Sequence, residues 1–296
     1  MNGSSILFSA GIILGACHQN QDRIQKPLTG EREPTEIFGF YSPPETKLIY
    51  SKYVSDTFKI FTSLPQKYNN DTLSTYPLIL VLDANGYLES IVAELKLGTL
   101  TQDFPKSIVI GIGYRDFWTM DSLRNRDYTY PAAVPEDSFK ISGGGQKFKK
   151  FINLELLPKI TAEYRVNEKQ IILLGHSLGG YFVLYYMLDS LENGEFRITN
   201  FISASPSLSY GNRYLLNLEK KLSSSKHKLP VKLYLSVGSL ERDTLQKENV
   251  FLDFKTQLEA RHYQGAQLKS MEFGNFGHMD AAMPGFMKGL VFLFEK

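Results

Sequence analysis

Residues 173–182, LLGHSLGGYF, join a strand pattern to a helix pattern through a glycine-rich turn. Residues 170–175 have the apolar pattern of a buried strand, and residues 178–190 have that of a buried helix. Between them, the letters GHSLGG match the G-x-S-x-G elbow, which exposes a nucleophile at the carboxyl edge of a parallel sheet. We therefore predict that Ser177 is a nucleophile. The alternative is a glycine-rich turn with an incidental serine.

This elbow predicts further details of the backbone. A turn this tight leaves no room for side chains two positions before and after the serine, which accounts for Gly175 and Gly179. It places the N–H of Leu178 at a helix N-terminus, where it can stabilise a developing oxyanion. The second N–H is expected from the segment DANGY, which follows an early strand. Asn85 or Ala84 is the candidate donor there.

Short apolar strands and helical segments alternate along the rest of the chain. Strand patterns occupy residues 46–54, 57–65, 76–83, 107–114, 200–206, 231–239 and 266–274. Helical patterns occupy residues 87–98, 145–166, 211–225, 244–264 and 279–295. Pro158 is expected to kink or split the second of these helices. The alternation predicts one α/β domain over residues 46–296, with a mostly parallel central sheet and helices on both faces.

A nucleophilic serine needs a general base, and in this fold the chain order is serine, acid, histidine. Of the five histidines, His278 lies in a glycine-rich loop just past the final predicted strand, at the carboxyl edge of the sheet. The others lie in a polar tether, inside the elbow, in a polar loop and at a helix end: His18, His176, His227 and His262. His278 is therefore the predicted base.

The acid should follow the strand pattern VKLYLSVGS, where Glu241 and Asp243 are available. We favour Glu241 because it comes sooner after the strand end, and Asp243 stays open as the alternative. Asp280 is a weaker candidate because it is too near His278 in sequence to hold it easily. Asp83 is weaker because its segment is assigned to the oxyanion hole.

The chain also resembles an esterase family of α/β-hydrolases that includes enterochelin and bacillibactin esterases, feruloyl esterases and mycolyltransferase-like proteins. The resemblance covers roughly residues 46–295. It rests on VLDANGY, RNRDYTYP, GGGQKFKKFINLELLPKI, GHSLGG, ASPSL and YLSVGSLE. It implies the α/β-hydrolase fold, with Ser177 as nucleophile, Glu241 as acid and His278 as base.

The expected function is a serine esterase that hydrolyses carboxylic esters through an acyl-enzyme and needs no cofactor. Siderophore, aryl and carbohydrate esters are candidate substrates. No metal-ligand spacing, phosphate-binding glycine loop or dinucleotide fingerprint is present in the sequence. Two alternatives stay open: an acyltransferase of the same fold, and a lipoprotein that binds a ligand without turnover.

Residues 115–144 lack clear periodicity, and we interpret them as a long loop on the substrate side. Trp118, Arg124 and Arg126 in this region suit an aryl or anionic acyl group. The alternative interpretation is that both arginines brace the loop through ion pairs with Asp121 or Asp127, while the tryptophan only packs.

Composition and the N-terminal segment limit the kinds of partner that we expect for the protein. The net charge is +2 and the basic residues are scattered, which gives no electrostatic case for nucleic acid. Cys17 is the only cysteine, so no internal disulfide can form, and it follows a short apolar stretch ending in a pattern that resembles a bacterial lipobox. We predict a lipoprotein signal peptide at residues 1–16, then Cys17 as lipid attachment site and a flexible tether to residue 45. The protein would be anchored to a membrane of a bacterial envelope. A buried N-terminal strand, or a start codon placed too late, is the alternative.

Overall fold

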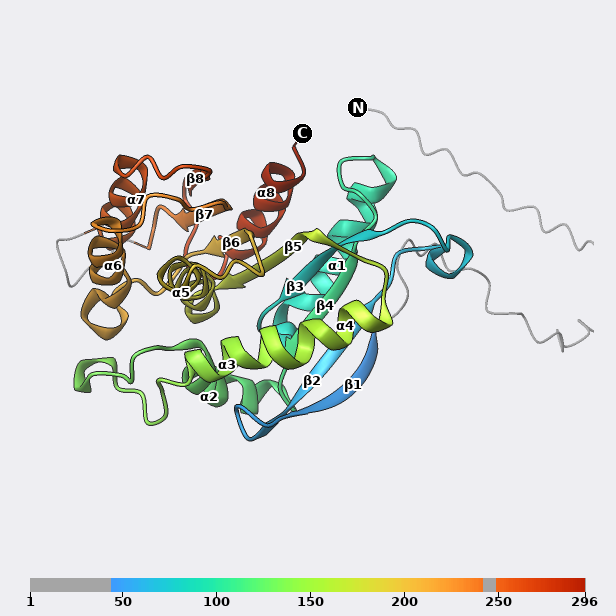
Figure 1. The fold of residues 1–296 in the computed structure, drawn as a ribbon, viewed down its shortest axis with the longest axis horizontal. Coiled ribbons are helices and arrows are strands. Elements are labelled where there is room, and N and C mark those ends of the chain that lie inside the picture. The colour runs from blue at the N-terminus through green and yellow to red at the C-terminus, as the bar shows by residue number, and fades with distance from the viewer. Residues whose placement is uncertain (1–43, 242–248, 296) are drawn as a thin grey trace, which may run out of the picture. The chain divides into compact units, whose positions relative to one another are not determined.

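Eight strands form one sheet in the order β1-β2-β4-β3-β5-β6-β7-β8, in a computed structural model that describes residues 44–241 and 249–295 (Figure 1). The strands are β1 (Glu45–Ser51), β2 (Asp56–Ser63), β3 (Tyr76–Val81), β4 (Ile108–Gly113), β5 (Val166–His176), β6 (Asn200–Ala204), β7 (Lys232–Gly238) and β8 (Gln267–Phe273). β1 and β2 pair antiparallel as a hairpin, β2 is antiparallel to β4, and all other pairs are parallel. The predicted mostly parallel sheet is confirmed.

Helices cover both faces of the sheet, as predicted. The helices are α1 (Ala84–Leu100), α2 (Phe117–Tyr128), α3 (Gly145–Phe151), α4 (Leu157–Glu163), α5 (Leu178–Asn193), α6 (Tyr210–Ser223), α7 (Val250–Ala260) and α8 (Ala282–Phe294). Apolar residues of α1 and α8 form one core cluster with one face of the sheet, and those of the other helices form a second cluster on the opposite face.

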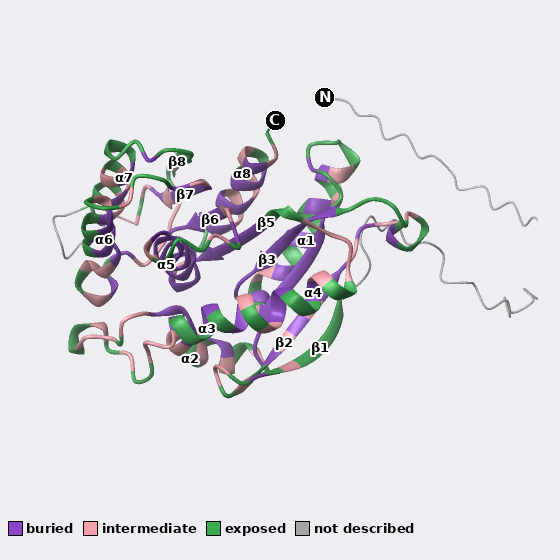
Figure 2. Ribbon diagram, viewed as in Figure 1, coloured by how far each residue is buried: buried purple, intermediate pink, exposed green. Residues whose placement is uncertain are grey.

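The central strands are buried on both sides, because their alternate residues serve the two clusters (Figure 2). In β3, Leu78 and Leu80 belong to the larger cluster, while Ile79 and Val81 belong to the cluster of α1 and α8. This is why these strands are continuous apolar runs in the sequence.

The predicted interruption near Pro158 is present as a π-helical turn, Ile152–Leu156, between α3 and α4. The N–H of Leu157 donates to the carbonyl of Ile152, five residues earlier. Proline has no N–H to continue the α-helical hydrogen bonds. The wider π-helical turn accommodates it, and the helical segment from α3 to α4 continues without a gap.

The interpretation of residues 115–144 as a loop is wrong in its first half, which forms α2. Asp116 caps this helix, and its Oδ1 accepts a hydrogen bond from the N–H of Thr119 at 2.8 Å. α2 has no apolar stripe, because its buried residues are Met120, Asp127 and Tyr128. The periodicity that identifies helices was therefore missing from its sequence.

Several predictions concern residues outside the described ranges. The chain divides into two units, residues 1–37 and Phe38–Lys296, and the structure describes part of the second only. The signal peptide, Cys17, Asp243 and nearly all of the tether stay predictions for this reason. β1 begins at Glu45, one residue before the expected start of the domain. None of the helices in the described ranges is both long and apolar enough to cross a membrane.

The cap of α2 can be tested by Asp116→Ala. Loss of the cap leaves an unsatisfied N–H in the first turn, so we expect the free energy of unfolding to fall by about 1 kcal/mol. Urea denaturation followed by circular dichroism measures this. Asp121→Ala, on the exposed side of the same helix, is the matched control. Equal effects of the two substitutions would mean that the cap does not stabilise α2.

Candidate active site

Ser177 occupies a sharp turn between β5 and α5 at the carboxyl edge of the sheet. Its backbone angles are φ 60° and ψ −120°, in a region that side-chain-bearing residues rarely adopt. The Ser177 N–H donates to the carbonyl of Ala204 at 3.0 Å, and its own carbonyl accepts from Tyr181 at 2.9 Å. Hydrogen bonds to β6 and α5 thus hold the strained residue, which is the geometry expected of a nucleophile elbow.

The glycines around the serine are needed for close backbone approach. A Cβ atom at position 175 would lie 2.5 Å from the carbonyl carbon of Gly179, and one at position 180 would lie 2.9 Å from the oxygen of Ala204. At position 179 the nearest atom would be a carboxylate oxygen of Asp83 at 3.2 Å. The prediction for Gly175 is confirmed, whereas Gly180 is more tightly enclosed than the predicted Gly179.

His278 and Glu241 lie side by side at the same edge of the sheet. The Nδ1 atom of His278 is 2.6 Å from Oε2 of Glu241. The histidine lies in the loop between β8 and α8, and the glutamate lies three residues after β7. The structure therefore brings together the base and the favoured acid that the sequence predicts.

Three donors hold the Glu241 carboxylate. Besides His278, its Oε1 accepts hydrogen bonds from Ser205 Oγ and from the N–H of Gly238, each at 2.6 Å. Burial alone would raise the pKa of Glu241, but the hydrogen bonds from His278, Ser205 and Gly238 bring it below its usual range. Glu241 is therefore ionised at neutral pH and is fixed in orientation. Ser205 was missed in the sequence, although ASPSL follows a strand ending at the same edge.

The weaker acid candidates have other contacts. Asp280 accepts a hydrogen bond from the N–H of Gly277 at 2.9 Å and thereby closes the turn that carries His278. Asp83 forms an ion pair with Arg124. Of the acid candidates in the described residues, Glu241 is the one that contacts the histidine.

The N-termini of two helices lie close together at this edge of the sheet, since a Cβ atom at Gly179 of α5 would lie 3.2 Å from the carboxylate of Asp83, which precedes α1. Leu178 is the first residue of α5, and Ala84 and Asn85 are the first residues of α1. The first N–H groups of a helix have no acceptor within it. The Asn85 side chain fixes this end of α1, because its Oδ1 and Nδ2 bond the backbone N–H and carbonyl of Tyr114 at 2.7 and 3.0 Å. Their role in an oxyanion hole stays a prediction.

The hydroxyl of Ser177 has a neighbour that the sequence did not reveal. Its Oγ lies 3.3 Å from Oγ of Ser207, whose backbone N–H also bonds the Ser177 carbonyl at 3.2 Å. Among the described residues, the Ser177 hydroxyl forms its hydrogen bond with Ser207 and does not bond His278. In unliganded enzymes the bond between nucleophile and base is often long and tightens when substrate binds.

Arg124 braces the site from α2. Its guanidinium forms a bidentate pair with Asp83, at 3.0 and 2.9 Å, and also bonds the carbonyl of His176 at 3.3 Å. Burial would lower the pKa of Arg124, but the Asp83 carboxylate raises it above its usual value. The alternative interpretation gave Arg124 a bracing role through an ion pair with Asp121 or Asp127. Arg124 does form an ion pair, but the predicted partners are wrong, because the pair is with Asp83.

Arg126 does pair with Asp127, at 2.8 and 3.0 Å, and also with Asp56. Trp118, in contrast, does not pack into the protein: it is 82% exposed and contacts Phe117 edge to face. The alternative is thus confirmed in part for Arg126 and wrong for Trp118. Substrate binding by Trp118, Arg124 and Arg126 stays a prediction.

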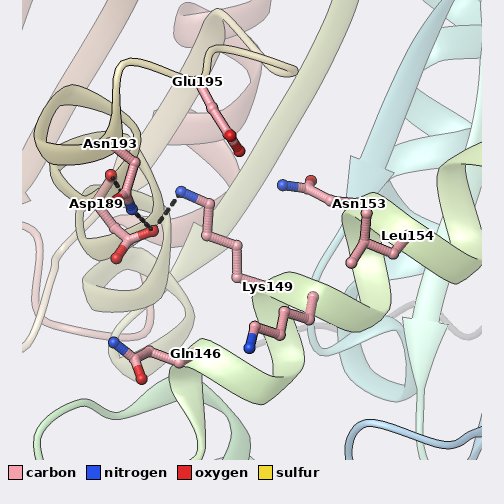
Figure 3. A pocket seen from close by; sticks show the side chains of 8 residues that line it. Gln146, Lys149, Asn153, Leu154, Asp189, Asn193 and Glu195 are labelled. Atoms are coloured by element: carbon pink, nitrogen blue, oxygen red, sulfur yellow. Dashed lines mark hydrogen bonds and ion pairs between the residues drawn. The ribbon is translucent and has the colours of Figure 1, made fainter.

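A cavity of about 260 Å³ lies on the face of α3 and α5 (Figure 3). Its lining residues include none of the predicted catalytic ones: Gln146, Lys149, Lys150, Asn153, Leu154, Asp189, Asn193 and Glu195. Lys149 reaches into it and bonds Asp189 at 2.6 Å and Ser190 at 2.8 Å. The amine of Lys149 is already paired. We therefore interpret this ion pair as a contact that helps α3 pack on α5.

Within the described ranges, no group of three or more histidine, cysteine, aspartate or glutamate side chains is placed to hold a metal ion.

Sequence comparison identifies relatives over most of the chain. Residues 51–276 match the family model described as "Putative esterase". A ferri-bacillibactin esterase of Bacillus subtilis, BesA, is 28% identical over 79% of this chain and 84% of its own length. An apo-salmochelin esterase of Escherichia coli O6:H1 is 27% identical over 75% of this chain and 70% of its own length.

Solved structures show the same fold. The BES protein of Bacillus cereus superposes with a TM-score of 0.72 at 25% identity, over 86% of this chain and 96% of that one. The enterobactin and salmochelin hydrolase IroE superposes with a TM-score of 0.66 at 23% identity, over 87% and 96%. The α/β-hydrolase fold expected from the sequence is thereby confirmed. The chain belongs to this esterase family and is a serine carboxylic-ester hydrolase.

Proposed function

We propose that the protein hydrolyses the ester bonds of a catecholate siderophore, with Ser177 as nucleophile, His278 as general base and Glu241 as the acid that orients the base. The observation that carries the catalytic part is the 2.6 Å contact between His278 and Glu241 at the edge where the elbow presents Ser177. The names of two relatives, a ferri-bacillibactin and an apo-salmochelin esterase, support the substrate class.

The geometry supports the following order of steps. Glu241 accepts the Nδ1–H of His278, which leaves Nε2 free to take a proton. On substrate binding, the Ser177 hydroxyl turns from Ser207 to His278, loses its proton to Nε2 and attacks the ester carbonyl carbon. The N–H groups of Leu178 and Asn85 stabilise the oxyanion.

Collapse of the tetrahedral intermediate breaks the bond to the leaving alcohol, which takes the proton from His278 and leaves an acyl group on Ser177. A water molecule then gives its proton to His278 and attacks this acyl-enzyme. The carboxylic acid leaves, and the proton returns to the serine oxygen.

Exposed aromatic side chains near the site support an aryl-bearing substrate. Phe117 and Trp118, at the start of α2, are 52% and 82% exposed. The Phe117 ring lies next to Gly86, where a Cβ atom would be 3.7 Å from it, and Gly86 follows the predicted oxyanion donor Asn85. Large exposed aromatic faces beside a reaction centre suit stacking with catechol rings.

Ser177→Ala is the direct test of the proposal. We expect hydrolysis of a tris-catecholate triester to fall by about 10⁴-fold or more, because the nucleophile is removed. A fluorophosphonate probe should label the wild-type protein and not the variant. Chromatography of the released acids, with iron-loaded and iron-free triester in parallel, measures the reaction. Ser225→Ala is the control, at an exposed serine after α6. Retained activity in Ser177→Ala would contradict the mechanism; activity on other esters alone would contradict the substrate.

Glu241→Gln tests the acid. The amide keeps an acceptor for Ser205 and Gly238 but loses the charge that stabilises the imidazolium, so we expect kcat to fall by about 10²- to 10⁴-fold. Steady-state kinetics on a p-nitrophenyl ester measures it. Asp280→Asn keeps the acceptor for Gly277 and should retain wild-type kcat. A loss of kcat in Asp243→Asn, with Glu241→Gln unaffected, would assign the acid to position 243 instead.

Trp118→Ala tests the aromatic rim. Removal of one stacking surface should raise KM for the tris-catecholate triester by about five- to tenfold. The kinetic constants for ethyl butyrate, which has no ring, should stay as in the wild type. Tyr50→Ala removes another exposed ring, on β1, and serves as control. If Trp118→Ala changed both substrates alike, the residue would not contact the aryl group.

A further inference from the structure

We propose that His176 is a positioning residue for the general base: its ring holds the backbone carbonyl of His278 and so fixes where the base is presented to Ser177. This inference rests on the proposed function, because it takes His278 to be the base. His176 was excluded as a base in the sequence since it adjoins the nucleophile. The structure gives it a different contact.

The two histidines are in direct contact. Nε2 of His176 lies 2.8 Å from the carbonyl oxygen of His278, and the two ring centroids are 4.5 Å apart. His176 is only 3% exposed and ends β5, in the middle of the sheet. The His278 side chain is 44% exposed on its loop. The buried His176 thus holds the more exposed His278.

The contacts of His176 define its tautomer. A carbonyl oxygen only accepts hydrogen bonds, so the proton resides on Nε2 of His176. Nδ1 then accepts from the hydroxyl of Tyr87, which lies 2.9 Å away. Burial, together with the neighbouring His278, lowers the pKa of His176 to about 4. The ring is therefore neutral at neutral pH, with one donor and one acceptor, and both are used.

Tyr87 connects His176 to α8, the helix that follows the base loop, by which we mean residues 274–281, the loop that carries His278. Its ring packs edge to face on Phe286 of α8, with centroids 5.4 Å apart and an interplanar angle of 88°. α8 begins four residues after His278. Tyr87 therefore supports His176 from one side and contacts the element that ends the base loop on the other.

Other bonds of the base loop fix its shape and its link to β7. Asp280 accepts from the N–H of Gly277, and Ser239 Oγ accepts from the N–H of Asn275, each at 2.9 Å. His176 supplies the link to β5, the strand that leads directly into Ser177. The distance between nucleophile and base is thereby set by the residue next to the nucleophile.

The test compares variants at position 176 that separate the donor from the ring. His176→Phe keeps a ring but loses the Nε2–H, and we expect kcat to fall by about 10- to 100-fold with KM unchanged. His176→Gln carries an amide N–H that can reach the His278 carbonyl, and should recover most of the loss. Tyr87→Phe removes the hydrogen bond to Nδ1 that supports the His176 ring and should give an intermediate loss. Tyr263→Phe, which loses a buried hydroxyl bond from the segment after α7 to Glu219 of α6, is the matched control.

Three readouts make the outcomes distinct: kcat and KM for a p-nitrophenyl ester, the rate of fluorophosphonate labelling, and the melting temperature. A fall in kcat and labelling rate that is rescued by glutamine, whatever the melting temperature, supports the proposal. Wild-type kcat in His176→Phe, or equal losses in His176→Phe and His176→Gln, overturns it. A wild-type protein that is inactive, or as active as Ser177→Ala, would instead contradict the proposed function.

Discussion

The ion pair between Arg124 and Asp83 is the interaction on which the arrangement of the site depends. The two side chains are 15% and 3% exposed, so each charge needs the other. Asp83 precedes α1 in a left-handed conformation, with φ 51°, and the guanidinium also bonds the carbonyl of His176. One side chain from α2 therefore fixes both the N-terminus of α1 and the residue that precedes Ser177. Removal of either partner from such a pair costs about 3 to 5 kcal/mol, because it leaves a buried charge alone.

The parts of the site that follow strand ends could be predicted from the sequence. Parallel strands end at one edge, so a serine after β5, a glutamate after β7 and a histidine after β8 must lie near one another once the strands are recognised. The apolar runs of the strands made that recognition possible. The structure has Ser177, Glu241 and His278 after these strand ends, as this reasoning expects, while their catalytic roles stay a prediction. Gly175 follows from the tightness of the turn.

The parts that depend on contacts between distant residues could not be predicted. α2 buries a charged residue, Asp127, and packs without an apolar stripe, so no periodicity marked it. The partner of Arg124 lies 41 positions away, and no local pattern distinguishes Asp83 from Asp121 or Asp127. The contact of His176 with a carbonyl 102 positions later is invisible for the same reason. Burial, not spacing, determines these pairs.

The strained backbone of Ser177 affects which residue evolution would be expected to keep at this position. Its φ of 60° and ψ of −120° are easy for glycine and cost other residues about 1 to 3 kcal/mol. Folding stability alone would thus favour glycine at this position. Drift without selection on catalysis would be expected to replace the serine, so its presence at a strained position is a sign of a protein selected for its chemistry rather than its stability.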